Sequence, residues 1–120
     1  RRVAIARAMT AKPRILLYDE PTTGLDPITA ITIDEEIIKL RDLEGVSSIL
    51  VTHQLRDAFF VAEHTAVREG KDLRFERASD QKAEEAEFIM LKEGRISFEG
   101  TATELRAAVP TDPYIQAFLS

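Results

Sequence analysis

Two short apolar runs, each followed by polar residues, constrain the fold of this chain more than any other feature. The runs are residues 15–18 and 48–51, and their length and polar flanks favour buried strands over helices. Between them, Asp26 followed by Pro27 is typical of a helix start, and Gly45 is typical of a helix end. A strand, a helix and a second strand in this order predict the α/β class, with a parallel sheet flanked by helices.

Shorter signals predict the remaining elements. Gly94 lies between two apolar segments, where it can supply the positive φ of a hairpin turn. Thr101 and Glu104 form a capping box that opens a helix. Helices are therefore predicted at residues 1–11, 55–63, 101–109 and 112–119, and a late β-hairpin at residues 88–98.

Residues 63–87 differ in character from the rest of the chain. About half of them are charged, apolar residues are sparse and no period is clear, which predicts a solvated loop. The chain has 120 residues, enough for one domain by the usual length of domains. Residues 64–87 are thus expected to be a charged insertion within that domain.

Composition excludes several classes of protein. Lys and Arg number 16 and Asp and Glu number 21, so the net charge is −5. This charge disfavours a phosphate-backbone footprint, and no nucleic-acid partner is expected. The sequence has no cysteine, which excludes disulfides, thiolate zinc sites and cysteine nucleophiles. The sequence opens at Arg1 within a helix-like pattern, so we expect a piece of a longer protein.

Three chemically active side chains follow the two predicted strands. Asp19 and Glu20 end the first strand, and His53 follows the second. The carboxyl ends of parallel strands meet at one edge of a sheet, where ligands bind. Adjacent residues in extended chain point in different directions, so one carboxylate suits Mg²⁺ and the other suits a water that attacks phosphorus. The alternative for the acidic pair alone is a solvated turn.

Several segments resemble motifs of the ATP-binding cassette (ABC) ATPases. Residues 15–21 resemble the Walker B segment, and residues 24–27 resemble the D-loop. Residues 52–53 resemble the segment that carries the switch histidine. Residues 2–8 resemble the helix that follows the LSGGQ signature. Residues 91–96, with residues 99–101, resemble the segment that closes the catalytic domain.

The resemblance implies a role for each matching residue. Asp19 would hold Mg²⁺ through water, Glu20 would be the general base, and His53 would contact the γ-phosphate of ATP. In the D-loop, Gly24, Leu25 and Asp26 would help to connect two nucleotide sites across a head-to-tail dimer. Asp26 is also a predicted N-cap, and one side chain can serve both purposes.

The resemblance also implies a partial domain. No G-x-x-x-x-G-K-[ST] phosphate loop is present in the sequence, so residues 1–120 would be the C-terminal part of a P-loop NTPase domain. Alone, this piece would bind ATP poorly and hydrolyse none. The complete protein would be an ATPase with ATP and Mg²⁺ as cofactors, and with a second ATPase subunit and a membrane permease as partners. It would lie in the cytoplasm, peripheral on the inner face of the cell membrane.

Two further segments resemble one branch of the family. Residues 51–59 and 112–119 are similar to the ATPases of lipid-asymmetry and solvent-resistance transporters, which work with a lipid-carrying partner of the mammalian-cell-entry type. This resemblance implies phospholipid transport. The alternatives are a soluble ABC-type ATPase of DNA repair or chromosome structure and a non-catalytic binding or dimerisation module. The residues that follow Glu20, 21–27, and the negative net charge favour the transporter over the DNA-repair ATPase. The presence of Asp19, Glu20 and His53 together disfavours a non-catalytic module.

Overall fold

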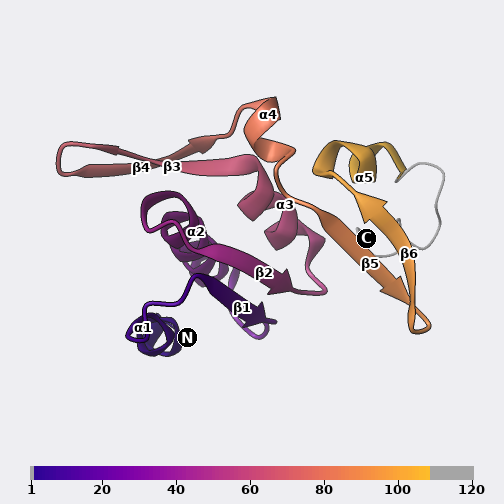
Figure 1. The fold of residues 1–120 in the computed structure, drawn as a ribbon, viewed down its shortest axis with the longest axis horizontal. Coiled ribbons are helices and arrows are strands. Elements are labelled where there is room, and N and C mark those ends of the chain that lie inside the picture. The colour runs from indigo at the N-terminus through magenta and orange to yellow at the C-terminus, as the bar shows by residue number, and fades with distance from the viewer. Residues whose placement is uncertain (1, 109–120) are drawn as a thin grey trace.

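Two parallel strands and the helix that joins them form the centre of the fold (Figure 1). The computed structural model describes residues 2–108. In chain order the elements are α1 (Arg2–Met9), β1 (Ile15–Asp19), α2 (Pro27–Leu43), β2 (Ser47–Val51), α3 (Leu55–Glu63), β3 (His64–Glu69), β4 (Asp72–Arg77), α4 (Asp80–Ala83), β5 (Phe88–Lys92), β6 (Arg95–Gly100) and α5 (Ala102–Ala108). The predicted mixed α/β class is confirmed. The helix predicted at residues 112–119 lies outside the described residues.

Helix α2 begins and ends at the capping residues that the sequence predicts. Asp26 accepts hydrogen bonds from the backbone N–H of Thr29 at 3.2 Å and from its hydroxyl at 2.5 Å. These bonds lower the pKa of Asp26. Pro27 occupies the first turn, where its missing N–H costs nothing. Gly45 follows the helix at φ +67°, a conformation that other residues rarely adopt.

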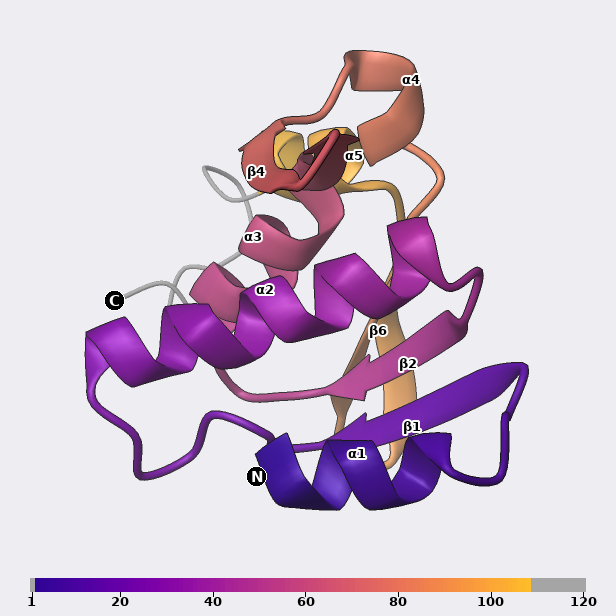
Figure 2. The ribbon, with the colours of Figure 1, turned by 90° about the vertical axis from the view of Figure 1, so that its left-hand side faces the viewer.

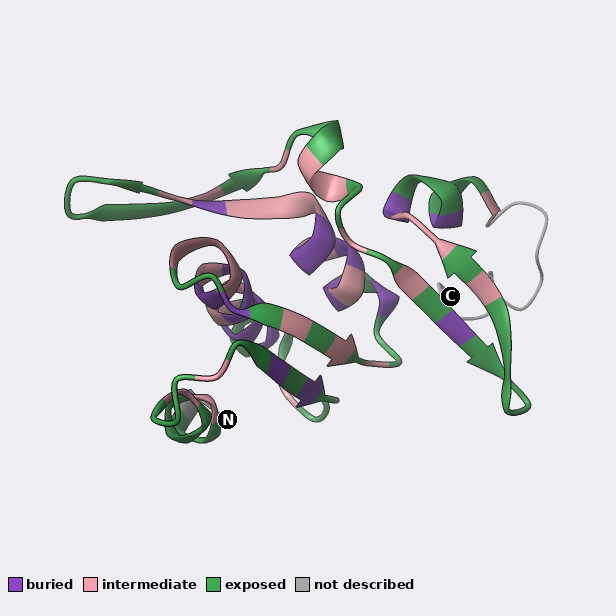
Figure 3. Cartoon of the chain, in the orientation of Figure 1, coloured by how far each residue is buried: buried purple, intermediate pink, exposed green. Residues whose placement is uncertain are grey.

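One face of the strand pair packs against α2 and makes the main core (Figures 2 and 3). Side chains alternate across β1, so Leu16 and Tyr18 point to the core while Ile15 and Leu17 point away. The buried members of this core are Leu16, Tyr18, Ile33, Ile37, Ile38, Leu40, Val46, Val61 and Ala66. The opposite face of the pair stays open.

A second core forms where α3 meets the late hairpin and α5. Its buried members are Leu55, Phe59, Met90, Ala102 and Leu105. The β5–β6 hairpin has the predicted turn, with both Glu93 and Gly94 at positive φ. The predicted capping box also forms, since Thr101 N–H donates to the Glu104 carboxylate and Glu104 N–H donates to the Thr101 hydroxyl. Among the helices of residues 2–108, none has the length and apolar character of a membrane-spanning segment.

The prediction of an irregular loop at residues 63–87 is wrong, because β3 and β4 pair there as an antiparallel hairpin and α4 follows. Gly70, at φ +61°, allows a tight turn between the two strands. Ala66 lies opposite Phe75, and both pack against the main core. The rest of the hairpin extends away from the core and is largely exposed (Figures 1 and 3). Its many charges hid the strand pattern in the sequence.

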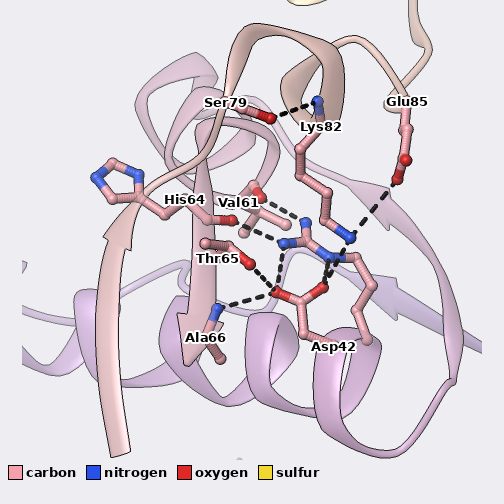
Figure 4. A network of polar contacts seen from close by, with 9 residues as sticks. Asp42, Val61, His64, Thr65, Ala66, Ser79, Lys82 and Glu85 are labelled. Atoms are coloured by element: carbon pink, nitrogen blue, oxygen red, sulfur yellow. Dashed lines mark hydrogen bonds and ion pairs between the residues drawn. The ribbon is translucent and has the colours of Figure 1, made fainter. Parts of the chain in front are cut away.

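Asp42, near the end of α2, anchors this hairpin (Figure 4). Its carboxylate accepts hydrogen bonds from the Thr65 hydroxyl and the Ala66 N–H, both at 2.9 Å, and from Arg41 Nε at 2.8 Å. Lys82 Nζ of α4 lies 3.2 Å away, and the Asp42 side chain is only 6% exposed. Burial opposes ionisation, but the bonds from Arg41, Ala66 and Thr65 outweigh it and hold the pKa of Asp42 well below its usual range.

Asp42→Asn is expected to loosen the hairpin from α2. The variant loses the charged acceptor of several buried bonds, so the free energy of unfolding should fall by about 2–4 kcal/mol at neutral pH. Because the folded pKa of Asp42 is depressed, this stabilisation is present above the usual carboxyl pKa and is lost as the pH falls below it. Hydrogen exchange at the Ala66 amide measures the effect directly.

A matched control for Asp42→Asn is Glu69→Gln in the same hairpin. Glu69 pairs with Arg74 at 2.6 Å, but both side chains are more than half exposed. Such pairs contribute about 0–1 kcal/mol, so exchange at Ala66 should stay close to that of the parent. Equal effects of the two variants would show that Asp42 does not anchor the hairpin.

Candidate active site at the carboxyl edge of the parallel strands

The carboxyl ends of β1 and β2 bring Glu20 and His53 into contact. Asp19 is paired with Val51 in the parallel register, and the Glu20 N–H donates to the Val51 carbonyl at 2.7 Å. His53 follows Val51 by two residues, and its Nδ1 lies 2.5 Å from Glu20 Oε1. The convergence that the strand order predicts is therefore present for these two side chains.

Glu20 is held in an unusual backbone conformation. Its φ is +49°, in the left-handed region that residues other than glycine rarely enter and that often marks functional positions. The Thr23 hydroxyl donates to Glu20 Oε2 at 3.0 Å, so each carboxylate oxygen has a neighbour. The Glu20 side chain is 25% exposed and the His53 side chain is 80% exposed, so solvent water can reach the pair.

Asp19 is exposed next to Glu20 at the same strand end. Within residues 2–108, no three His, Asp or Glu side chains gather as a metal site. Mg²⁺ nevertheless fits this edge, because it keeps several waters and commonly binds one or two carboxylates together with substrate phosphates. The donor set around Asp19 suits Mg²⁺ carried by a nucleotide rather than a metal held by the protein alone.

The predicted D-loop forms a turn between β1 and α2. Gly24 has φ +79° and is exposed, as is Asp26. Leu25, between them, is half-buried and packs against the main core. The carboxylate of Asp26 caps α2, so the structural role predicted for this residue is confirmed.

The described residues do not enclose a nucleotide. A cavity of about 200 Å³ lies between α1 and β1 and includes Asp19 and Pro21 in its lining. Typical ligand pockets begin at about 300 Å³. A larger cavity, of about 660 Å³, lies between α1 and α2, apart from Glu20 and His53. A nucleotide at Glu20 would therefore need walls beyond these residues.

Three buried polar residues were not among the predicted site residues. They are Thr22, Asp34 and Asp57, each less than one tenth exposed. Asp34 interrupts an apolar stripe of α2 between Ala30 and Ile38. That interruption was the available signal, because an acid on the apolar face of a helix requires a partner.

Comparisons with known proteins agree with the motifs. The chain is 40% identical over 79 residues (65% of its length) to the phosphate import ATP-binding protein PstB 2 of Aliivibrio fischeri. It is 43% identical over 63 residues (52%) to the glycine betaine uptake system ATP-binding protein YehX of Escherichia coli. It is 40% identical over 62 residues (52%) to ABC transporter I family member 17 of Arabidopsis thaliana.

These matches cover 28%, 20% and 24% of the three relatives, so the chain spans about a quarter of their length. No family model matches the chain. The relatives nevertheless confirm the resemblance that the motifs indicate, because this chain is similar in sequence to ATP-binding proteins of ABC transporters.

Proposed function

We propose that this chain is the C-terminal part of the ATP-hydrolysing domain of an ABC transporter, with residues 64–87 as a charged insertion. The observation that carries the proposal is the contact between Glu20 and His53 at the carboxyl edge of two parallel strands, next to Asp19. The domain would act with ATP and Mg²⁺. It would pair head-to-tail with a second ATPase subunit through Gly24 and its neighbours Leu25 and Asp26.

Each residue of the site has a distinct task in this proposal. Glu20 accepts the proton of the attacking water, and its partly exposed carboxylate leaves room for that water. His53 donates a hydrogen bond to a terminal phosphate oxygen and orients the Glu20 carboxylate. Asp19 would hold Mg²⁺ through water, and the metal when bound neutralises charge on the phosphates.

The open face of the strand pair indicates that another segment packs against this part of the protein. Four apolar side chains on that face are 47–67% exposed: Ile15, Leu17, Ile49 and Val51. Parallel strands are normally covered on both faces. We infer that a further segment with the phosphate loop covers this face and completes the nucleotide site. Without that segment the 120-residue piece would be inactive.

The relatives support a transporter among the functions considered. Their names describe ATP-binding proteins for phosphate import and glycine betaine uptake. The complete protein would then work with a membrane permease, at the cytoplasmic face of the membrane. Phospholipid transport with a lipid-carrying partner of the mammalian-cell-entry type rests only on residues 51–59 and 112–119, and the names of these relatives lend it no support.

A comparison of the two histidines tests this proposal. In the complete protein, His53→Ala should lower ATP hydrolysis by about 10²-fold or more, as expected when a donor to a developing phosphate charge is lost. His64→Ala is the matched control, since the His64 ring stacks on Phe60 and its Nδ1 contacts the Phe60 carbonyl, away from Glu20. Phosphate release with Mg²⁺ and ATP measures both. Equal rates in the two variants would contradict the site.

A further inference from the structure

Buried polar side chains connect the loop that follows Glu20 with helices α3 and α2. Thr22 lies in the loop after β1, Asp57 in the first turn of α3 and Asp34 in α2, and they are 6%, 3% and 1% exposed. The Thr22 hydroxyl donates to Asp57 Oδ2 at 2.6 Å. The Asp34 carboxyl makes a hydrogen bond with Asp57, and Asp34 Oδ1 has no partner among the described residues.

Two buried carboxyl groups in hydrogen-bond contact require a proton between them, because two carboxylates there would repel each other. Asp34 holds that proton. Burial, together with the hydrogen bond and the charge of Asp57, raises the pKa of Asp34 to about 9. At neutral pH the Asp34 O–H therefore donates to the Asp57 carboxylate, which also accepts the Thr22 hydroxyl.

The positions of these residues connect the pair to the site. Thr22 follows Glu20 by two residues, and Asp57 follows His53 by four. The bond between Thr22 and Asp57 thus joins the loop that carries Glu20 to the helix that follows His53. We propose that Thr22, Asp57 and Asp34 are positioning residues, which hold Glu20 opposite His53 by joining the loop after β1 to the buried polar side chains of α3 and α2. This inference rests on the proposed ATPase function.

The backbone of Glu20 explains the need for such a link. A non-glycine residue at φ +49° persists only where its surroundings hold it. On one side the Glu20 N–H is bound to Val51. On the other side the chain is fixed two residues later by Thr22. Without that second attachment, the loop can relax and carry the carboxylate away from His53.

Deprotonation of Asp34 should make the link between Thr22, Asp57 and Asp34 depend on pH. The charged groups that act on Asp34 are Asp57 and Arg56 from α3 and Glu35 from its own helix. Arg56 favours the charged form of Asp34, and Glu35 opposes it. Above about pH 9 the proton is lost, the two carboxylates repel and the loop loosens. Hydrolysis should therefore decline on the alkaline side.

The kinetic test uses the complete protein with Mg²⁺ and ATP. Thr22→Val removes the hydroxyl and keeps the shape, so kcat should fall by up to about 10²-fold while KM for ATP stays unchanged. Asp34→Ala should lower kcat in the same way. Asp34→Asn keeps a hydrogen-bond donor but has no titrating proton. Its kcat should therefore be close to that of the parent, unlike that of Asp34→Ala, and its hydrolysis rate should not decline at alkaline pH. Asp42→Asn is the control for stability alone, and its kcat should match the parent.

Two outcomes would overturn the proposal. One is a Thr22→Val variant with the kcat of the parent. The other is an alkaline decline that persists unchanged in Asp34→Asn, which would place the responsible proton elsewhere.

Two further measurements need no hydrolysis. Isotope-edited infrared spectra should show a protonated carboxyl at neutral pH in the parent and none in Asp34→Asn. A crystal structure of Thr22→Val should retain the fold but lose the contact between Glu20 and His53. If the parent hydrolyses no ATP, the proposed function fails, and these measurements still decide whether the carboxyl pair holds the loop. Retention of the contact in Thr22→Val would refute the positioning role.

Discussion

Glu20→Gln in the complete protein is expected to stop ATP hydrolysis while ATP binding continues. The amide keeps the size and polarity of the side chain, but it cannot accept the proton of the attacking water at neutral pH. Loss of a general base costs about 10²–10⁴-fold in rate. Binding should survive, since Asp19 remains at the strand end to hold the metal. The variant should therefore accumulate as a dimer with ATP enclosed.

Asp19→Asn separates metal binding from proton transfer. This variant should weaken the Mg²⁺-dependent binding of ATP itself, so it should not accumulate the dimer. Size-exclusion chromatography with ATP, beside a hydrolysis assay, distinguishes the two variants. Glu69→Gln, at the exposed hairpin, is the matched control and should behave as the parent. If Glu20→Gln hydrolyses ATP like the parent, the base is another residue, and the mechanism must be rebuilt around His53.

Local signals predicted the elements whose ends they define. Helix α2 begins after Asp26, which accepts a hydrogen bond from the free N–H of Thr29, and ends before Gly45, which tolerates positive φ. Thr101 and Glu104 form their reciprocal bonds within one helical turn. In each case the interacting groups are four residues apart or closer, so the sequence contains the whole interaction.

The hairpin β3–β4 was missed because its stability depends on distant contacts. Half of its strand positions carry a charged residue, and of its side chains only Ala66 and Phe75 pack against the core. Its anchor, Asp42, is 23 residues from Thr65. A charged strand of this kind is recognisable only when the element that anchors it is known.

The same distinction applies to the candidate site. The strand order alone predicted that Asp19, Glu20 and His53 share one edge of the sheet, because parallel strands end together. The left-handed backbone of Glu20 was not predictable, since nothing in the residue type favours it. The bond of Thr22 with Asp57 was also missed. It spans 35 residues, so neither Thr22 nor Asp57 has its partner within its own stretch of sequence.

The 120-residue chain by itself is expected to release no phosphate from ATP. The sequence has no Lys-bearing phosphate loop, which cradles the phosphates of a nucleotide with backbone N–H groups. The cavity that includes Asp19 is only about 200 Å³. Glu20 and His53 can orient a water, but without a bound phosphate that water has nothing to attack.

The assay needs a chain that is folded and soluble. The open face with Leu17 and Ile49, 67% and 55% exposed, favours self-association, so the oligomeric state is measured before the assay. Phosphate release is then followed with Mg²⁺ and ATP, and the complete protein is the positive control. Turnover of ~1 s⁻¹ or above by the chain alone, a rate typical of enzymes, would show that these residues hold a nucleotide without a phosphate loop. If hydrolysis appears when the proposed segment with the phosphate loop is supplied, and Glu20→Gln in this chain abolishes it, then the base lies here and the phosphate cradle lies in the other segment.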